Sequence, residues 1–546
     1  MLTRGLPIVG IAALAFVGGV LLSANPGASE RQLVAQYVHD WTRHQVPQMY
    51  GLLDAASRRA ATEPQFAAAL ERAATTATLT SLRATRVFSL NGGRVAVKMR
   101  VGTRLWGTLR ETLVVPLTGS GSSARVHFSP EVLFPGLRPG ERLSRTVTLP
   151  PRGTLLASDG EPLAVGPGRT SPIPDVAGQI VGTVGPVPSD EAAQYAAQGY
   201  PPGALVGLDG LEHIFQSRLV GTRGGRLLAG HRALATAAAV PAPPLKTTLS
   251  PVLERAAVAA MGGHYAGIAV MNPRTGALLA LAGIAFSALQ PPGSTMKIIT
   301  ASGALEAGIT KLSTVYPIQT AATLSGFTLH NASGEACGGT LLNAFAVSCN
   351  SVFAPLGAKL GARRLVNIAQ RFGFNQPPSI PGAAESTIPP AGSVGDDLAV
   401  GSSAIGQGLV QTTPLEMADV AATIAMGGRR PIPTLLAHQR PRFVRVISPY
   451  VAHEVQTMMV AVVQFGTGVA AQIPGVTVAG KTGTAELKNT AAPGQSGAQN
   501  TDAWFVGYAP VGHPRYVAGA LFPNQGAGGA TAAPPVHDVL AAALGK

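Results

Sequence analysis

The first part of the chain mixes helical and strand-like hydrophobic patterns. Apolar residues recur at helical spacing from Arg31 to Tyr37 and from Phe66 to Ala74, whereas apolar and polar residues alternate from Arg94 to Arg100. A further run from Arg110 to Val115 supplies an antiparallel partner for that strand. These patterns predict an α+β piece near the N-terminal end.

The C-terminal part of the chain has strand patterns at both ends and helical patterns between them. Ser250 is an N-cap candidate with Pro251 at the first helical position, which predicts a helix to about Met261. Helical patterns dominate from Ser294 to about Ala425. The other predicted elements are a hairpin formed by Ile268 to Met271 and Leu278 to Ala282, strands at Val476 to Thr484, Trp504 to Tyr508 and Val517 to Phe522, and a helix from Val536 to Leu544. We expect the first and last strands to share one sheet flanked by helices.

Two further helix signals lie between these patterns. The stretch from Leu211 to Leu219 is predicted to be one helix. The sequence Thr413-Pro414-Leu415-Glu416 is a capping box, so we expect Thr413 and Glu416 to cap each other's backbone N–H groups at a helix start.

Proline- and glycine-rich segments divide the chain. Phe134 to Gly140 is a predicted domain boundary, and Val240 to Pro244 is a predicted stiff linker. We therefore predict domains at residues 25–137, 138–245 and 246–546, that is, an α/β (α+β) multidomain protein.

The N-terminal end carries an uncharged apolar run from Leu6 to Ala24. As a helix, this run matches the roughly 20 residues that cross the hydrocarbon core of a bilayer. Arg4 precedes the run, and a positive charge favours the cytoplasmic side for that end. We predict residues 1–24 to be a single-pass membrane anchor with the remainder extracytoplasmic. A cleaved signal peptide is the alternative.

Composition narrows the classes of partner and cofactor. The net charge is +14, yet the 41 Lys and Arg residues are spread along the chain without a basic block, which argues against nucleic acid and suits an anionic membrane or wall polymer. Only two cysteines occur, so Cys-rich metal sites are excluded. We expect no metal and no cofactor.

Three short motifs carry the candidate chemistry. They are Ser294-Thr295-Met296-Lys297, Ser348-Cys349-Asn350 and Lys481-Thr482-Gly483-Thr484. Each motif alone is weak, but S-x-x-K, S-x-N and K-T-G occur in that order, separated by roughly fifty and then roughly 130 residues. Their shared order and spacing indicate that the three motifs belong to one active site.

Simple chemistry assigns a role to each polar group in these motifs. A helix starting at Ser294 places Lys297 on the same face, and an amine can activate the serine once burial or a second cation lowers its pKa. Lys481 supplies that cation if its strand packs beside the helix. Ser348 could relay a proton to the leaving amine, and Asn350 could bind the substrate amide. Thr482, Gly483 and Thr484 form the strand that would bind a terminal carboxylate, with the Ser294 and Thr484 N–H groups as an oxyanion hole.

The motifs resemble the active site of β-lactamases and penicillin-binding proteins. Flanking sequence strengthens the resemblance: Gly406-Gln407-Gly408, Asp502 to Pro510 and Ala533 to Val536 look like transpeptidase-domain sequence. Upstream, Pro151 to Gly160 and Gly207 to Glu212 resemble the dimerisation or pedestal domain of class B penicillin-binding proteins, and residues 25–137 loosely resemble an NTF2-like domain.

The resemblance implies a monofunctional peptidoglycan D,D-transpeptidase. Its implied ligands are peptidoglycan stem peptides and β-lactams, and its implied partner is a membrane-embedded glycan polymerase. A bifunctional class A enzyme would need a glycosyltransferase domain, and residues 25–245 show no such catalytic motif. A β-lactamase, a non-enzymatic penicillin-sensing receptor and a D,D-carboxypeptidase use the same serine. The first two fit the domain layout less well, whereas the carboxypeptidase stays open.

Other enzyme classes find less support in the sequence. Gly475 to Thr482 fits the Walker A expression, but its β-branched Val-Thr-Val core predicts a strand instead of a phosphate-binding loop. The G-x-S-x-G and H-E-x-x-H patterns are absent, which argues against an ordinary serine hydrolase and a zincin.

Cys337 and Cys349 are expected to form a disulfide. They are the only pair available, lie close in sequence beside Ser348, and belong to a chain predicted to be exported to an oxidising compartment. Two buried free thiols are the alternative.

Overall fold

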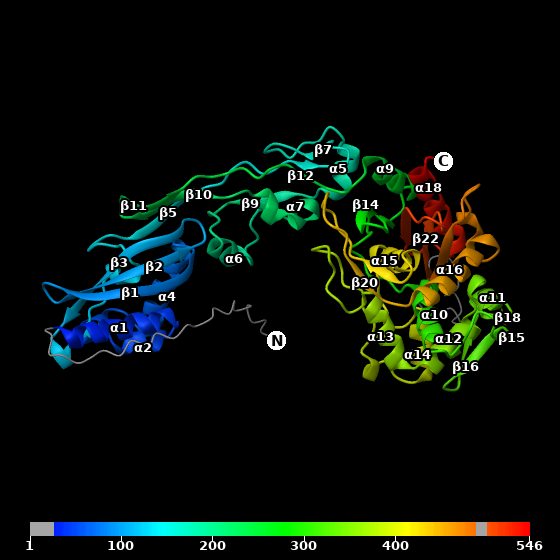
Figure 1. Cartoon of the computed structure of the whole chain (residues 1–546), viewed down its shortest axis with the longest axis horizontal. Helices are drawn as coiled ribbons and strands as arrows, with labels where there is room; N and C mark the ends of the chain where they lie inside the picture. Colours follow the sequence, from blue (N-terminus) through cyan, green and yellow to red (C-terminus); the bar gives the residue numbers. More distant parts are fainter. Residues whose placement is uncertain (1–26, 488–499) are drawn as a thin grey trace. The chain divides into compact units, whose positions relative to one another are not determined.

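The computed structural model describes residues 27–487 and 500–546 (Figure 1). The predicted membrane anchor, residues 1–24, lies outside these residues. Within the described ranges, no helix combines the length and the apolar character needed to cross a membrane. The described chain folds into two compact units, and segments from the middle of the chain contribute to both.

The first unit consists of residues 27–148, Pro188–Pro202 and Arg223–Ala239. Its strands form one sheet in the order β1-β2-β3-β4 and another in the order β11-β10-β5. The helices are α1 (Ala28–Thr42), α2 (Val46–Gly51), α3 (Ala55–Ala60), α4 (Glu63–Thr76) and α6 (Ala192–Ala197), and the strands are β1 (Leu79–Leu90), β2 (Arg94–Thr103), β3 (Gly107–Thr118), β4 (Arg125–Val126), β5 (Leu143–Thr148), β10 (Gly224–Ala229) and β11 (Arg232–Ala237).

The hydrophobic pattern explains the core of this first unit. Val95, Val97 and Met99 on β2 are buried, as the alternation predicts, and they pack in one cluster with Tyr37 of α1 and Phe66 of α4. The predicted helices and antiparallel strands of this region are therefore confirmed. The predicted segment 138–245 contributes to both units, and the three domain boundaries remain a prediction.

The second unit consists of Leu149–Val187, Gly203–Thr222 and residues from Val240 onward. Before its central sheet it contains small strands and short helices. These are β6 (Leu155–Leu156), β7 (Pro162–Ala164), α5 (Pro174–Ile180), β8 (Val184–Pro186), β9 (Leu205–Gly207), α7 (Gly210–Ile214), α8 (Gln216–Leu219) and β12 (Leu245–Lys246). The single helix predicted from Leu211 to Leu219 is thus wrong in detail, because the chain breaks into α7 and α8 at Phe215, whose φ of −105° and ψ of 17° leave the helical region.

A five-stranded sheet forms the centre of this second unit, in the order β14-β13-β23-β22-β21. The first two strands come from the predicted hairpin and the other three from the C-terminal end, so the shared sheet is confirmed. The strands are β13 (Gly267–Asn272), β14 (Ala277–Gly283), β21 (Ala479–Glu486), β22 (Thr501–Ala509) and β23 (Tyr516–Phe522).

Both faces of the central sheet are covered. On β13, Ile268 and Val270 join a cluster with α9 (Pro251–Ala260) and α18 (Ala533–Leu544), whereas Ala269 and Met271 join the larger cluster on the opposite face. This alternation follows from the period-two geometry of a strand, and continuous apolar sequence is what a strand buried on both faces requires. Ser250 caps α9 as predicted, because its hydroxyl accepts from the Leu253 N–H.

The larger cluster is built by the helical middle of the chain. Its helices are α10 (Lys297–Glu306), α11 (Leu341–Ala346), α12 (Asn350–Leu360), α13 (Ala362–Phe372), α14 (Asp397–Ala404), α15 (Pro414–Ala425) and α16 (Pro449–Gln464). Small strands interrupt this helical region where helix was the dominant prediction. They are β15 (Val315–Gln319), β16 (Ala321–Leu324), β17 (Phe327–His330) and β18 (Cys337–Thr340). Two further strands, β19 (Arg429–Pro431) and β20 (Phe443–Arg445), lie after the predicted helical stretch.

Candidate active site

The three motifs meet at one place in the second unit. Ser294 lies in η3, a 3-10 turn (Gly293–Met296) that leads into α10, where Lys297 is the first residue. Ser348 and Asn350 lie at the junction of α11 and α12. Lys481 lies on β21, at the edge of the central sheet. The α-helix predicted to start at Ser294 therefore starts three residues later, after one tighter turn.

Two glycines allow η3 and β21 to touch. At Gly293, which has φ of +52°, an added Cβ would lie 2.8 Å from the Thr484 carbonyl oxygen. At Gly483, an added Cβ would lie 2.7 Å from the Pro292 carbonyl oxygen. Because real Cβ atoms do not approach backbone oxygen so closely, any side chain at either position would push the serine turn away from the strand.

The Ser348 hydroxyl lies between the two motif lysines. Lys481 Nζ donates to Ser348 Oγ at 2.9 Å, and Lys297 Nζ lies 3.3 Å from the same oxygen. Ser348 holds this position with φ of +64°, in the left-handed region that non-glycine residues seldom adopt. A strained backbone at a motif serine is a feature of sites where geometry is imposed by the surrounding fold.

Lys297 is fully buried, and its amine donates to two oxygen atoms that can only accept hydrogen bonds. Its Nζ donates to the Ser348 carbonyl oxygen at 2.7 Å and to Asn350 Oδ1 at 2.7 Å. Burial, together with the nearby Lys481 charge, holds the pKa of Lys297 well below its usual range. A neutral amine has two N–H groups, and these two bonds use both, so the lone pair remains for a serine hydroxyl.

Lys481 is the second buried amine of the site. Burial lowers the pKa of Lys481 to about 7, and its remaining hydrogen bond runs to the Thr482 carbonyl oxygen at 3.1 Å. Each lysine also faces an aromatic ring: Lys297 Nζ is 5.6 Å from the Phe353 ring centre and Lys481 Nζ is 5.5 Å from that of Phe345. The ring faces partly compensate the lost hydration of an ammonium.

The two threonine hydroxyls of the third motif form hydrogen bonds to neighbouring segments. The Thr482 hydroxyl bonds the Thr467 hydroxyl at 2.5 Å, and the Thr484 hydroxyl accepts from the Gly528 N–H at 3.2 Å. Thr467 follows α16 in the turn Gly466 to Gly468, and its own N–H donates to the Ala346 carbonyl oxygen beside the Ser348 loop. The sequence patterns did not identify Thr467. Its only signal in the sequence is a threonine between two glycines, Gly466 and Gly468.

A disulfide joins Cys337 to Cys349, with the Cα atoms 5.8 Å apart. It links β18 to the N-terminus of α12, directly beside Ser348. The neighbouring hairpin strand β17 adds a second tie, because Asn350 Nδ2 donates to the His330 carbonyl oxygen at 3.2 Å. The S-x-N motif is thus fixed from one side by residues 315–340, where small strands stand in place of the predicted helix.

The arrangement is that of an acyl-transfer site. Ser294 is partly exposed and lies in the turn just before Lys297, an amine whose pKa is lowered by burial. A second hydroxyl, Ser348, contacts both amines, and one of them, Lys481, lies on the edge strand β21. These side chains are the candidates for nucleophile, base, proton relay and carboxylate-binding group. Among the residues described, no cluster of three or more His, Cys, Asp or Glu side chains could hold a metal ion.

Two family models match the chain. Residues 266–541 match the penicillin binding protein transpeptidase domain, and residues 163–232 match the penicillin-binding protein dimerisation domain. The second match lies inside the segment that resembled a pedestal domain.

Curated relatives and solved structures agree with these matches. The peptidoglycan D,D-transpeptidase PbpA of Mycobacterium tuberculosis is 36% identical over 295 residues, which cover 48% of this chain and 56% of that relative. The aligned region thus spans little more than half of that relative's length. The crystal structure of PBPA from M. tuberculosis superposes with a TM-score of 0.58 at 26% identity, covering 72% of this chain and 99% of that one. A D,D-transpeptidase domain from Eggerthella lenta gives a TM-score of 0.59 at 28% identity, covering 72% and 98%.

Proposed function

Because the chain belongs to the penicillin-binding protein transpeptidase family, we propose that it is a peptidoglycan D,D-transpeptidase acting through an acyl-enzyme on Ser294. The observation that carries the proposal is the Ser348 hydroxyl held between two buried amines, 3.3 Å from Lys297 Nζ and 2.9 Å from Lys481 Nζ. The pairing with a dimerisation domain matches the class B architecture that the sequence predicted.

The first half of the reaction follows from this geometry. Ser294 Oγ attacks the carbonyl carbon of the penultimate D-alanine while its proton passes to the neutral Lys297 amine. The proton then passes through Ser348 Oγ to the departing amine, so the peptide bond breaks and D-alanine leaves. The Ser294 and Thr484 N–H groups stabilise the oxyanion, and Lys481 with Thr482 and Thr484 binds the terminal carboxylate.

The second half reverses the proton path. The amine of a second stem peptide attacks the ester on Ser294, loses its proton through Ser348 to Lys297, and the serine leaves with a proton returned by Lys297. The product is the cross-link. A β-lactam enters the same path but remains attached, as imipenem does in the acyl-enzyme structure of M. tuberculosis penicillin-binding protein A.

Labelling with a fluorescent penicillin tests the nucleophile. We expect one adduct per chain, located on Ser294 by mass spectrometry of the digested protein, with slow release. Ser294→Ala should remove it. Ser302→Ala is a matched control on α10, the helix that follows Ser294, because its hydroxyl donates to the Ile298 carbonyl oxygen and not to a lysine. An adduct on another residue contradicts the proposal, and release within seconds favours a β-lactamase.

A donor peptide ending in D-Ala-D-Ala, supplied with a D-amino acid acceptor, separates transpeptidase from carboxypeptidase. Transfer to the acceptor should exceed hydrolysis. Dominant hydrolysis at saturating acceptor would identify a D,D-carboxypeptidase instead.

The anchor and the partner belong to the same proposal. We propose that residues 1–24 hold the enzyme in the membrane and that a membrane-embedded glycan polymerase supplies nascent strands. Fractionation of cells tests the first point: the protein should stay with membranes after a high-salt wash and leave them in detergent.

A further inference from the structure

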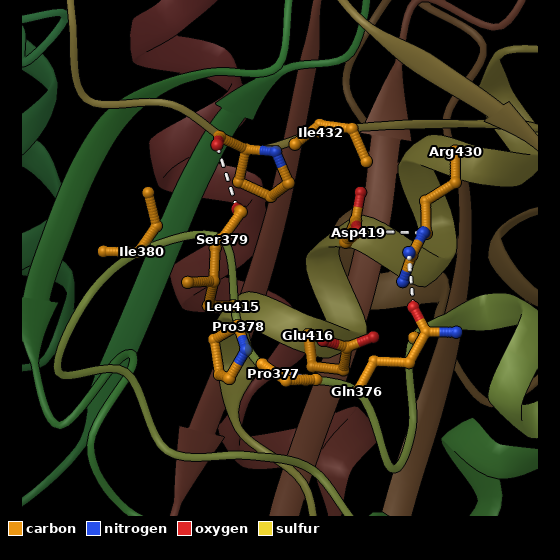
Figure 2. Close-up of a pocket in the computed structure, with 12 residues that line it drawn as sticks. Gln376, Pro377, Pro378, Ser379, Ile380, Leu415, Glu416, Asp419, Arg430 and Ile432 are labelled. Carbon is orange, nitrogen blue, oxygen red and sulfur yellow. Dashed lines mark hydrogen bonds and ion pairs between the residues drawn. The ribbon is translucent and has the colours of Figure 1, made fainter. Parts of the chain in front are cut away.

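A second group of ionisable side chains lies around a small cavity of the second unit, of about 110 Å³ (Figure 2). Glu416 and Asp419 reach it from α15, and Arg430 reaches it from β19. Its other walls are mostly apolar, with Pro377, Pro378, Ile380, Leu415 and Ile432, and the polar side chains of Gln376 and Ser379 complete the lining. None of these residues belongs to the three catalytic motifs.

Three polar atoms at this cavity lack hydrogen-bond partners among the described residues: Glu416 Oε1, Asp419 Oδ1 and Arg430 Nε. Asp419 is only 3% exposed, so water outside the protein does not reach its carboxylate. The nearest compensation is weak, since Arg430 Nε lies 4.0 Å from Asp419 Oδ2 and Arg430 Nη2 bonds Gln376. Buried polar atoms are nearly always paired, so the two orphaned carboxylate oxygens at this cavity indicate a place for a hydrogen-bond donor.

The unpaired Glu416 oxygen shows that the predicted capping box between Thr413 and Glu416 forms only in part. Thr413 does cap α15, its hydroxyl accepting from the Glu416 N–H at 3.2 Å, but the reciprocal bond from the Glu416 side chain to Thr413 is absent in the described structure. The carboxylate instead points towards the end of α13. Gly373 makes room there, since a Cβ at that position would collide with both Glu416 Oε1 and Arg430 Nη1.

The charges at the cavity do not balance. Two carboxylates face one guanidinium, so the empty site carries a net negative charge when both acids are ionised. Burial raises the pKa of Glu416 to about 7, and burial together with Glu416 raises the pKa of Asp419, against the opposing effect of Arg430. Near neutral pH the pair therefore retains a proton that a cation could replace.

A metal ion fits this site poorly. Hard divalent ions take six or more oxygen ligands, whereas two carboxylates adjoin the cavity together with a repelling guanidinium. An alkylammonium fits better, because its N–H groups donate to the two orphaned carboxylate oxygens and its carbon stem covers the proline and isoleucine walls. The volume is somewhat below that of an engineered cavity of about 150 Å³ that holds benzene.

We propose that this cavity binds a primary alkylammonium group with a stem of about four carbons, held by Glu416 and Asp419 and enclosed by Pro377, Pro378 and Ile432. The ligand chemistry is that of a lysine side chain or a small aliphatic amine. The site is separate from the acylation chemistry, so the proposal does not depend on the proposed function.

Calorimetric titration with n-butylammonium chloride at constant ionic strength tests the site in the detergent-solubilised full chain. We expect saturable binding of about millimolar strength, with n-butanol and tetramethylammonium at least about tenfold weaker, since one lacks the charge and the other the N–H donors. Repeating the titration at pH 7 in buffers of different ionisation enthalpy should reveal release of up to about one proton per ligand.

Neutral variants locate the binding. Glu416→Gln and Asp419→Asn should each weaken n-butylammonium binding by about tenfold or more, while the exposed Glu385→Gln, which removes the same charge from the surface, should leave it unchanged. Thermal unfolding checks that each variant is folded. If a variant does not fold, the comparison of the three ligands on the wild type still tests the proposal. The proposal is overturned by no saturable heat, by equal binding of n-butanol, by tighter binding of Mg²⁺, or by an equal loss in Glu385→Gln.

Discussion

The second unit holds two pairs of like ionisable groups that are wholly or largely buried, and the two pairs differ in how their hydrogen bonds are satisfied. Lys297 and Lys481 have acceptors in the Ser348 hydroxyl and in backbone or amide oxygens, and each faces an aromatic ring. Glu416 and Asp419 each leave an oxygen without a described partner, beside a cavity. In both pairs burial moves a pKa towards neutrality, upward for the acids and downward for the amines.

The difference in hydrogen bonding suits the lysine pair to proton transfer and the carboxylate pair to ligand binding. A buried ionisable group whose hydrogen bonds are already satisfied is held in a fixed geometry, which is what proton transfer requires. A buried group with unsatisfied atoms carries a desolvation cost that a ligand can relieve. The lysine pair is therefore complete before substrate arrives, whereas the carboxylate pair is incomplete until something fills the cavity.

The largest expected effect tests the role of Lys297 as the base. Lys297→Arg should slow penicillin acylation by at least about 1,000-fold, because a guanidinium does not lose its proton near neutral pH. Lys481→Arg should keep about a tenth or more of the rate, since a fixed positive charge still binds carboxylate. The measurement is the second-order rate of labelling by fluorescent penicillin. Equal losses in the two variants would show that Lys297 is not the base.

The disulfide distinguishes the two pairs, because it lies beside Ser348 and the lysine pair and not at the carboxylate cavity. Replacing Cys337 and Cys349 by serine should lower the free energy of unfolding by roughly 3 kcal/mol, the chain-entropy value for a loop of this size. Denaturant titration with and without reductant measures this, and the double variant should no longer respond to reductant. Binding of n-butylammonium should be the same in both proteins. An unchanged unfolding midpoint on reduction would argue against a stabilising role.

The pH profile of acylation tests the two lysine pKa values. The rate should rise with pH as Lys297 loses its proton, then fall as Lys481 loses its charge, at about pH 7 in the free enzyme. In Lys481→Arg the falling limb should move beyond the accessible range, since arginine stays charged. Stopped-flow acylation between pH 5 and 9 gives both limbs. A falling limb that persists in the arginine variant would assign it to another group.

The smallest expected effect concerns stability, where the two pairs should act with opposite sign. The pKa of Glu416 is raised to about 7, so its contribution to stability is present at low pH and is lost as pH rises through about 7. In the wild type this loss lowers the free energy of unfolding by about 2.5 kcal/mol between pH 5 and 8, and Glu416→Gln should remove that fall. Lys481, with its pKa lowered to about 7, should make stability rise with pH above 7, and Lys481→Met should remove that rise. Thermal unfolding across this range measures both, and matching slopes in all three proteins would contradict the prediction.

The sequence by itself determined the elements whose signals are local. Ser294 and Lys297 had to be neighbours, because one helical turn separates them. The cap at Ser250 and the alternation on β2 also follow from interactions within a few residues. The order of the three motifs identified the family, which the comparisons confirm.

Only the tertiary structure decided which distant groups meet. Lys481 and Ser348 are 133 residues apart, and the sheet order and two glycines bring them into contact. The same long-range packing placed Thr467 behind Thr482 and turned Glu416 from its predicted cap towards the end of α13 and Arg430. Local rules failed at these positions because burial and charge from other elements outweigh a capping hydrogen bond of about 1 kcal/mol.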